Sequence, residues 1–234
     1  MFAILRRELL GFFSSPIAYI YLAVFYIFAG YFFFTGPLYW GFTQLGPVFS
    51  NLFSVVLFLI PILTMRLMSE DKKHRTDQAL LTAPVSLTGI VLGKFFAAMV
   101  VYLLGLAITV VFAFVVAVLA AVNWLSVFSN LVALLLLGMA HMAICLFVSS
   151  LTENQVIAAI GGFASAFLLL MLGSLKTIVT GDILQKIITG ISFSDRYSSF
   201  SVGMFNLADV VFFLSVCAIF LFLTVRVLEK RRWS

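Results

Sequence analysis

Two short patterns contain residue types that could do chemistry. His141 and Cys145 stand four residues apart in an apolar run, so they share one helix face and could begin a metal site. Gly89, Gly93 and Lys94 resemble a phosphate-binding loop, but the glycines stand one residue too close and neither Ser nor Thr follows the lysine. Two ligands are too few for zinc. We therefore expect His141 and Cys145 to serve in packing or hydrogen bonding, and the glycines to form a close helix contact.

A charged segment from residue 66 to residue 86 is the other candidate for function. Seven of the 23 charged residues (14 basic and 9 acidic) lie between Arg66 and Asp77. No Asp, Glu, Lys, Arg or His occurs from Leu9 to Met65, and only His141 occurs from Phe95 to Thr152. A charge at the centre of a bilayer costs about 2.5 kcal/mol or more. The segment must therefore lie in water, where it can meet a soluble partner.

The composition is that of a protein that crosses a membrane several times. Hydrophobic residues make up 64% of the 234 residues and charged residues only 10%, whereas soluble domains carry about 25% charge. A span takes about 20 residues, so six helices fill the chain and leave no room for a soluble catalytic domain. The net charge of +5 is better explained by membrane topology than by nucleic-acid binding. We predict an all-α protein of the cell membrane, with no enzyme site and no nucleic-acid partner.

Hydrophobic runs, Pro and Gly divide the chain as a single transmembrane domain. An apolar stripe at helical spacing predicts a short interfacial helix before Pro16, and Gly-Pro pairs at 36–37 and 46–47 bracket an expected loop. Pro61 predicts a kink in the second span. The expected segments are an interfacial helix at 1–15, spans at 17–34, 48–68, 87–122, 125–151, 155–175 and 207–228, a charged segment at 69–86, and an amphipathic or re-entrant external segment at 176–206.

The distribution of Lys and Arg predicts that both termini lie in the cytoplasm. With six spans, eleven basic residues fall on the inner side and three on the outer side. Lys94 stands at the inner end of the third span, where we expect its side chain to snorkel toward water. The inner residues are Arg6, Arg7, Arg66, Lys72, Lys73, Arg75, Lys94, Arg226, Lys230, Arg231 and Arg232, and the outer residues are Lys176, Lys186 and Arg196.

Within the charged segment the residues predict a short helix. Thr76 can cap its start, Asp77 complements the helix dipole, and Pro84 ends it. The helix would present Leu80 and Leu81 on a surface that also carries charge. The alternative interpretation is a solvated loop rich in charges.

The segment resembles the coupling segment of ABC-2 type exporter permeases, in particular the small permeases of gliding motility and of nitrous-oxide maturation. The similarity covers Met65-Arg66, Glu70-Asp71-Lys72-Lys73 and the run from Thr76 to Ser86, with further matches at both ends of the chain. The resemblance implies a cytoplasmic coupling helix that docks on an ATPase subunit. The residues to which it assigns that coupling are Glu70, Arg75, Thr76, Asp77, Gln78, Leu80, Leu81 and Pro84.

Two positions depart from the family pattern. Many members have Gly immediately before the Thr, where this chain has Arg75, and a Leu-Glu pair where it has Asp77-Gln78. The resemblance implies two ATPase subunits that bind ATP and Mg²⁺, no cofactor in this chain, a second copy or a paralogous permease, contact with membrane lipid, and room for an extracellular accessory protein.

Two other functions are compatible with six spans. A membrane scaffold that anchors an ATPase without transporting anything would share the coupling helix. An ion-coupled carrier would need ionisable groups at membrane depth, and away from the ends of the expected spans His141 is the one such residue among Asp, Glu, Lys, Arg and His. No internal repeat of the kind found in carriers is readable either. The sequence therefore favours an exporter permease.

Overall fold

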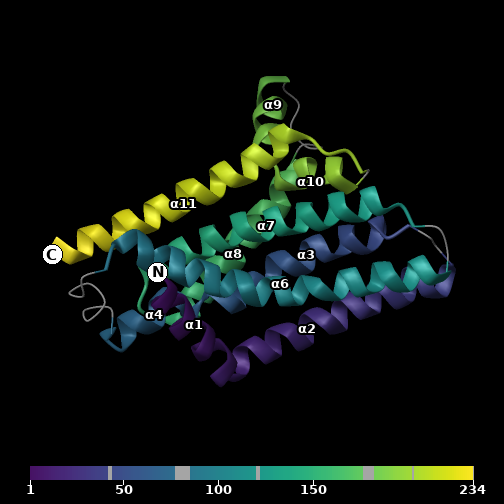
Figure 1. Cartoon of the computed structure of the whole chain (residues 1–234). Helices are drawn as coiled ribbons and strands as arrows, with labels where there is room; N and C mark the ends of the chain where they lie inside the picture. Colours follow the sequence, from purple (N-terminus) through teal and green to yellow (C-terminus); the bar gives the residue numbers. More distant parts are fainter. Residues whose placement is uncertain (42–43, 77–84, 120–121, 176–181, 202, 234) are drawn as a thin grey trace.

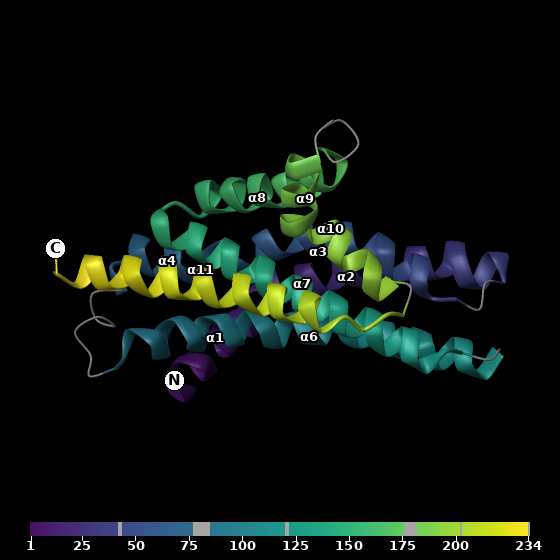
Figure 2. The same ribbon diagram turned by 90° about the horizontal axis from the view of Figure 1, so that it is seen from above.

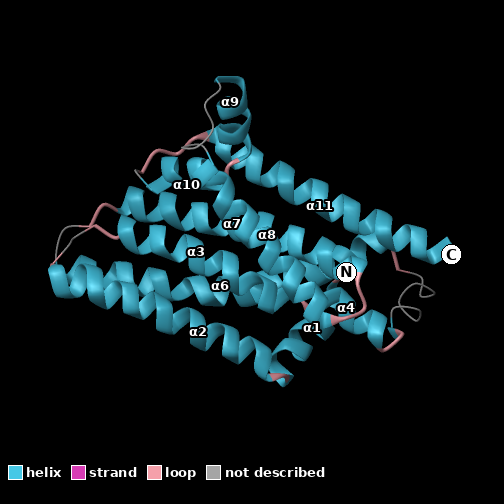
Figure 3. Cartoon of the chain, turned by 180° about the vertical axis from the view of Figure 1, so that it is seen from behind, coloured by secondary structure: helices cyan, strands magenta, loops and turns pink. Residues whose placement is uncertain are grey.

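Helices form all the regular structure in the described part of the chain, and no strand occurs there. The computed structural model describes residues 1–41, 44–76, 85–119, 122–175, 182–201 and 203–233. Figure 3 shows the helical ribbon from behind. The helices are α1 (Phe2–Ser14), α2 (Pro16–Phe33), the π-helix η1 (Phe34–Leu38), α3 (Gly46–Thr64), α4 (Arg66–Lys73), α6 (Leu87–Leu119), α7 (Trp124–Leu151), α8 (Gln155–Leu175), α9 (Asp182–Ile191), α10 (Phe193–Ser201) and α11 (Leu207–Trp233).

Six helical stretches are long and apolar enough to cross a membrane, which confirms the predicted number of spans. The second of them joins α3 and α4, because the chain stays helical across the start of the charged segment. The stretches are Pro16–Leu38, Gly46–Lys73, Leu87–Leu119, Trp124–Leu151, Gln155–Ser174 and Leu207–Arg232.

The span made by α7 lies at the centre of the bundle. It packs against α3, α6, α8 and α11, and its most apolar window is 61% buried, as is that of the second span. Figure 2 shows α8 on one side of α7 and α6 on the other. The spans of α8 and α11 are only 22% and 17% buried, so most of their surface is free for lipid or for another subunit. The N- and C-termini lie at the same end of the bundle (Figure 1).

Glycines allow the helices to approach closely. A Cβ atom at Gly138 of α7 would lie 2.3 Å from the ring of Tyr102 of α6. A Cβ atom at Gly93 of α6 would lie 2.9 Å from the side chain of Ile4 of α1, so Gly93 does form the close helix contact predicted for it. Because glycine has no side chain, the neighbouring helix can pack directly against the backbone at these positions. Such close packing holds membrane helices together, since lipid supplies no hydrophobic driving force between them.

The expected loop at Gly36-Pro37 is wrong, because the helix continues through both residues. They lie in η1, where the Tyr39 N–H donates to the Phe34 carbonyl five residues back. Such a π-turn accommodates Pro37, which lacks an N–H. The hydroxyl of Thr35 also donates to the Tyr31 carbonyl at 2.8 Å. Because the helix continues, the first span reaches Leu38, whereas it was predicted to end at residue 34.

The segment between the last two spans contains two helices, in line with the helical spacing of its apolar residues. α10 packs beside α7 and α3. The Tyr197 hydroxyl donates to the Phe49 carbonyl at 2.9 Å, and the Ser129 hydroxyl donates to the Phe200 carbonyl at 3.2 Å. The first bond joins α10 to the first turn of α3, and the second joins it to the early part of α7. Both bonds are buried.

Candidate functional site

The described part of the predicted coupling segment is the helix α4 and the turn that follows it. Glu70 lies in α4, and Arg75 and Thr76 lie just after it. The helix expected from Asp77 to Ala83 lies outside the described residues, with the other predicted coupling residues Asp77, Gln78, Leu80, Leu81 and Pro84. The site that can be built from the structure is therefore the connection between this segment and the spans.

Main-chain and serine hydrogen bonds attach α4 to the end of α7. The Ser149 hydroxyl accepts from the backbone N–H groups of Met68 (3.3 Å) and Ser69 (3.2 Å), and donates to the Met65 carbonyl at 3.0 Å. Lys72, which is 7% exposed, donates from Nζ to the Ser150 carbonyl. These serines are not among the residues predicted for the site. The one feature of the sequence that could have indicated them is that they form a polar pair at the end of an apolar run.

A cluster of four charged residues, of which Lys94 is buried and Arg7 is half exposed, joins α4 to α1 and α6. Lys94 Nζ lies 2.9 Å from Glu8 Oε1 and 2.6 Å from Asp71 Oδ2. Arg7 Nη2 contacts the same two carboxylates, at 2.7 Å and 3.2 Å. Two cations and two anions leave the cluster neutral, which offsets part of the cost of removing charges from water. The Thr76 hydroxyl extends it by donating to Asp71 Oδ1 at 2.8 Å.

The expectation that Lys94 snorkels to water is wrong. Its side chain is only 2% exposed, because the first turns of α1 cover it and supply a carboxylate within reach. Glu8 and Asp71 are likewise not among the residues predicted for the site. A possible signal was the acidic residue in α1, which stands among residues otherwise basic or apolar.

Glu70 makes a separate connection from α4 to the start of α2. Its carboxylate accepts from Arg66 Nε at 2.7 Å, one helical turn earlier. Arg66 Nη1 then donates to the Ser15 hydroxyl at 2.8 Å, at the junction of α1 and α2. Glu70 thus orients the guanidinium that connects the charged segment to the first span.

Arg75 adopts a left-handed backbone conformation, with a φ of +56°. Few L-residues favour this region, whereas Gly enters it without steric cost. Gly, which the family pattern described above has at this position, would therefore suit the backbone found here. Arg75 occupies the turn at a conformational cost.

Another ion pair lies at the start of α11, away from the charge cluster. Arg196 Nη1 of α10 lies 2.8 Å from Asp209 Oδ1, and Asp209 is 4% exposed. The guanidinium also donates to the Gly190 carbonyl and stacks over the ring of Phe212, 4.1 Å from its centroid. These contacts join α9, α10 and α11. They explain the two charges as structural links within the segment.

His141 and Cys145 lie in the core, as the packing interpretation predicted. His141 Nε2 contacts the Leu57 carbonyl of α3 at 3.0 Å, and the Cys145 sulfur lies 3.5 Å from the same nitrogen. Among the described residues, no group of three or more His, Cys, Asp or Glu side chains could hold a metal ion. His141 therefore links α7 to α3, and Cys145 packs beside it in α7.

Comparison with known proteins agrees with this arrangement. No curated protein matched the chain. The family profile described as "ABC-2 family transporter protein" matches residues 5–168, which is more than half of the chain. The matched part includes α4, the charge cluster and the serines at the end of α7. With its six helices able to span a membrane, the chain is a multi-pass membrane protein that belongs to the ABC-2 transporter family.

Proposed function

We propose that this chain is the permease subunit of an ATP-driven exporter. Two permease subunits, either two copies of this chain or this chain and a paralogue, would work with two soluble ATPase subunits. The ATPases bind ATP and Mg²⁺, and this chain has no ATPase site of its own. We also assign it to the gliding-motility and nitrous-oxide-maturation subgroup, on the motif similarity between Met65 and Ser86.

The observation that carries the proposal is that α4 is linked to several other helices at once. It continues α3 along the chain, and Ser149 and Lys72 attach it to α7. Asp71 attaches it through Lys94 to α6 and through Arg7 to α1. Ion pairs and hydrogen bonds of this kind keep a helix and its neighbours in fixed register. A displacement of α4 would therefore move several spans together.

The proposed mechanism starts at residues 77–83. Closure of the ATPases around nucleotide would push on this segment, which docks on them through Leu80 and Leu81. Thr76 and Asp71 connect the push to the charge cluster, because the hydroxyl of Thr76 is bonded to that carboxylate. The spans would then rock, and substrate would leave between the two permease subunits along the second and fifth spans.

The test is a double variant, Leu80→Asp with Leu81→Asp, in the full complex. We expect the chain to insert normally and the ATPase to lose its stimulation, because two carboxylates cannot enter an apolar docking surface without a large desolvation cost. Lys73→Asp is a matched control, since it also lowers the net charge by two on an exposed residue of the same segment. Normal stimulation in the double variant would overturn the coupling role.

The first measurement is a pull-down of the tagged chain in mild detergent from its native membrane. Co-purification of an ABC ATPase that depends on Leu80 and Leu81 supports the permease assignment. Stimulated ATP hydrolysis without movement of any substrate would favour the alternative, a membrane scaffold. An intact chain that retains no ATPase would contradict both.

A further inference from the structure

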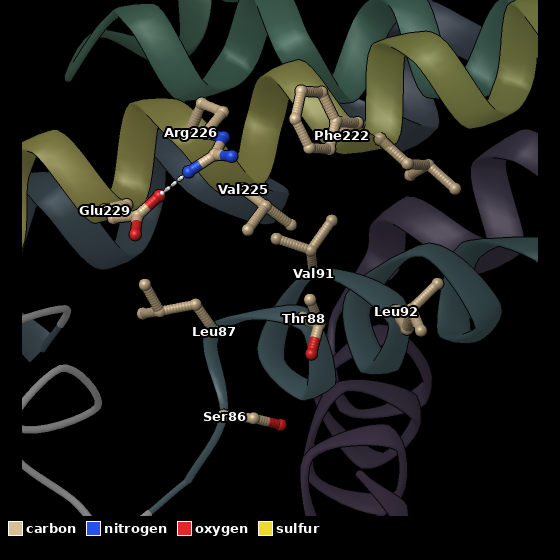
Figure 4. A pocket seen from close by; sticks show the side chains of 10 residues that line it. Ser86, Leu87, Thr88, Val91, Leu92, Phe222, Val225, Arg226 and Glu229 are labelled. Atoms are coloured by element: carbon tan, nitrogen blue, oxygen red, sulfur yellow. Dashed lines mark hydrogen bonds and ion pairs between the residues drawn. The ribbon is translucent and has the colours of Figure 1, made fainter.

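A groove of about 500 Å³ opens between α6 and α11 at the end of the bundle where both chain termini lie. The first turns of α6 form one wall, and the last turns of α11 form the other. Figure 4 shows Val91 of α6 facing Val225 of α11 across the gap. The span of α11 is only 17% buried, so the groove lies on a helix whose surface is largely free for lipid.

The polarity of the groove changes along its length. Its outer end, near the start of α6 and the end of α11, carries the hydroxyls of Ser86 and Thr88 and the carboxylate of Glu229. Its inner end is lined by apolar side chains such as Leu92 and Phe222. The change follows the bundle axis, which is the direction of the membrane normal for helices that span a bilayer. A polar end and an apolar end in this order match the two ends of a phospholipid.

An ion pair marks the boundary between the two ends. Arg226 Nη1 lies 2.6 Å from Glu229 Oε2, and the two side chains are 59% and 43% exposed. The guanidinium carbon lies 4.8 Å from the centroid of the Phe222 ring, which keeps it over the apolar end. Both partners retain free hydrogen-bonding positions toward the groove, because guanidinium has five N–H donors and a carboxylate has about four acceptor positions.

We propose that this groove binds a phospholipid whose headgroup carries a primary amine. The phosphodiester accepts hydrogen bonds from Arg226, the ammonium donates to Glu229, and an acyl chain lies along the apolar end. Planar guanidinium groups bind phosphate through paired hydrogen bonds. The site goes beyond the permease function, since it requires neither an ATPase nor transport.

The charge of the ion pair selects the headgroup. Arg226 and Glu229 together are neutral, so a zwitterionic headgroup matches them charge for charge. An anionic headgroup such as glycerol phosphate would place its charge near Glu229 without a second cation in the groove lining. A choline headgroup carries a positive charge but has no N–H to donate. The groove therefore favours ethanolamine over both.

The experiment uses the full chain, purified in detergent and stripped of lipid. Phosphatidylethanolamine, phosphatidylcholine and phosphatidylglycerol with identical acyl chains are titrated, and bound lipid is counted by native mass spectrometry. The midpoint of thermal unfolding is recorded in parallel. The variants are Arg226→Gln, Glu229→Gln and Thr88→Phe, the last of which fills the groove from an exposed position. Arg232→Gln removes the same charge from an exposed position later in α11, outside the groove lining, and is the control.

We expect phosphatidylethanolamine to bind about tenfold more tightly than the other two lipids, the ratio given by one hydrogen bond to a charged group. Glu229→Gln should remove this preference, and Arg226→Gln and Thr88→Phe should weaken all three lipids by tenfold or more. Arg232→Gln should match the wild type. The proposal fails if phosphatidylglycerol binds best, if the lipids bind equally, or if Arg226→Gln behaves as the control does. It also fails if Thr88→Phe leaves lipid binding unchanged.

Discussion

His141 of α7 donates its Nε2–H to the main-chain carbonyl of Leu57 in α3, at 3.0 Å. A carbonyl can only accept, so the ring nitrogen must carry the hydrogen. Leu57 stands four residues before Pro61, which has no N–H to complete the helical bond. The histidine therefore satisfies a carbonyl that the proline leaves without a helical partner, in a region with no water to replace it.

Replacing His141 with Leu should destabilise the protein by about 1–3 kcal/mol, the cost of a buried acceptor left without a donor. Pro61→Ala restores an N–H four residues after Leu57. We therefore expect His141→Leu to cost much less in the Pro61→Ala background. Thermal unfolding of the four proteins in one detergent checks the cycle. Additive effects of the two substitutions would contradict the shared hydrogen bond.

Gly138→Ala should destabilise the contact between α6 and α7. The new methyl group would lie 2.3 Å from the ring of Tyr102, which is fully buried. Overpacking of this kind costs about 1–3 kcal/mol. Gly30→Ala in α2 is the control, because nothing lies within 4 Å of a Cβ atom there. A helix interior favours Ala over Gly, so the Gly30→Ala control should unfold at the wild-type temperature or higher. Equal unfolding midpoints for the two variants would refute the close contact.

Lys94→Met should disrupt the charge cluster. It leaves Glu8 and Asp71 with Arg7 as their remaining cation. Because both carboxylates are partly exposed and keep this partner, the loss should be about 1–3 kcal/mol, below that of a fully buried pair. We expect a lower unfolding temperature together with weaker ATPase stimulation, because α6 would lose its ion pairs to α1 and α4. Lys73→Met is the control, since Lys73 is exposed on the same helix. Unchanged stability of Lys94→Met would show that the cluster contributes nothing.

Arg75→Gly should stabilise the turn after α4, by up to about 1 kcal/mol, because glycine adopts a φ of +56° without the steric cost paid by other residues. Lys73→Gly, two residues earlier in the helix, should have the opposite sign and cost about 1 kcal/mol. Arg75→Val should be worse than the wild type, because β-branched residues are rare in this region. Unfolding midpoints of the three variants test the order, and equal effects at both positions would exclude the strained turn.

Much of the fold follows from the sequence alone. Long apolar runs separated by charge or by Gly and Pro predict six spans, because hydrocarbon imposes a length and a polarity that each segment satisfies by itself. The amphipathic or re-entrant segment expected at 176–206 likewise contains a helix, α9. These features depend on neighbours in the chain.

The local rules failed where backbone hydrogen bonding could be rearranged. Gly36-Pro37 indicated the end of the first span, but a π-turn carries the helix through both residues. The second span was expected to end at residue 68, yet α4 extends it as far as Lys73. In each case the backbone found partners that residue preferences alone do not specify.

The connections around the candidate site were decided by tertiary structure. Glu8 and Lys94 are 86 positions apart in the sequence, and Met68 and Ser149 are 81 apart. Nothing in either neighbourhood selects the other, because such pairs form only after the close contact at Gly93 and the packing of α7 have set the distances between helices. The sequence determined which segments enter the membrane, since that depends on each segment's own polarity, whereas helix packing determined which charges meet.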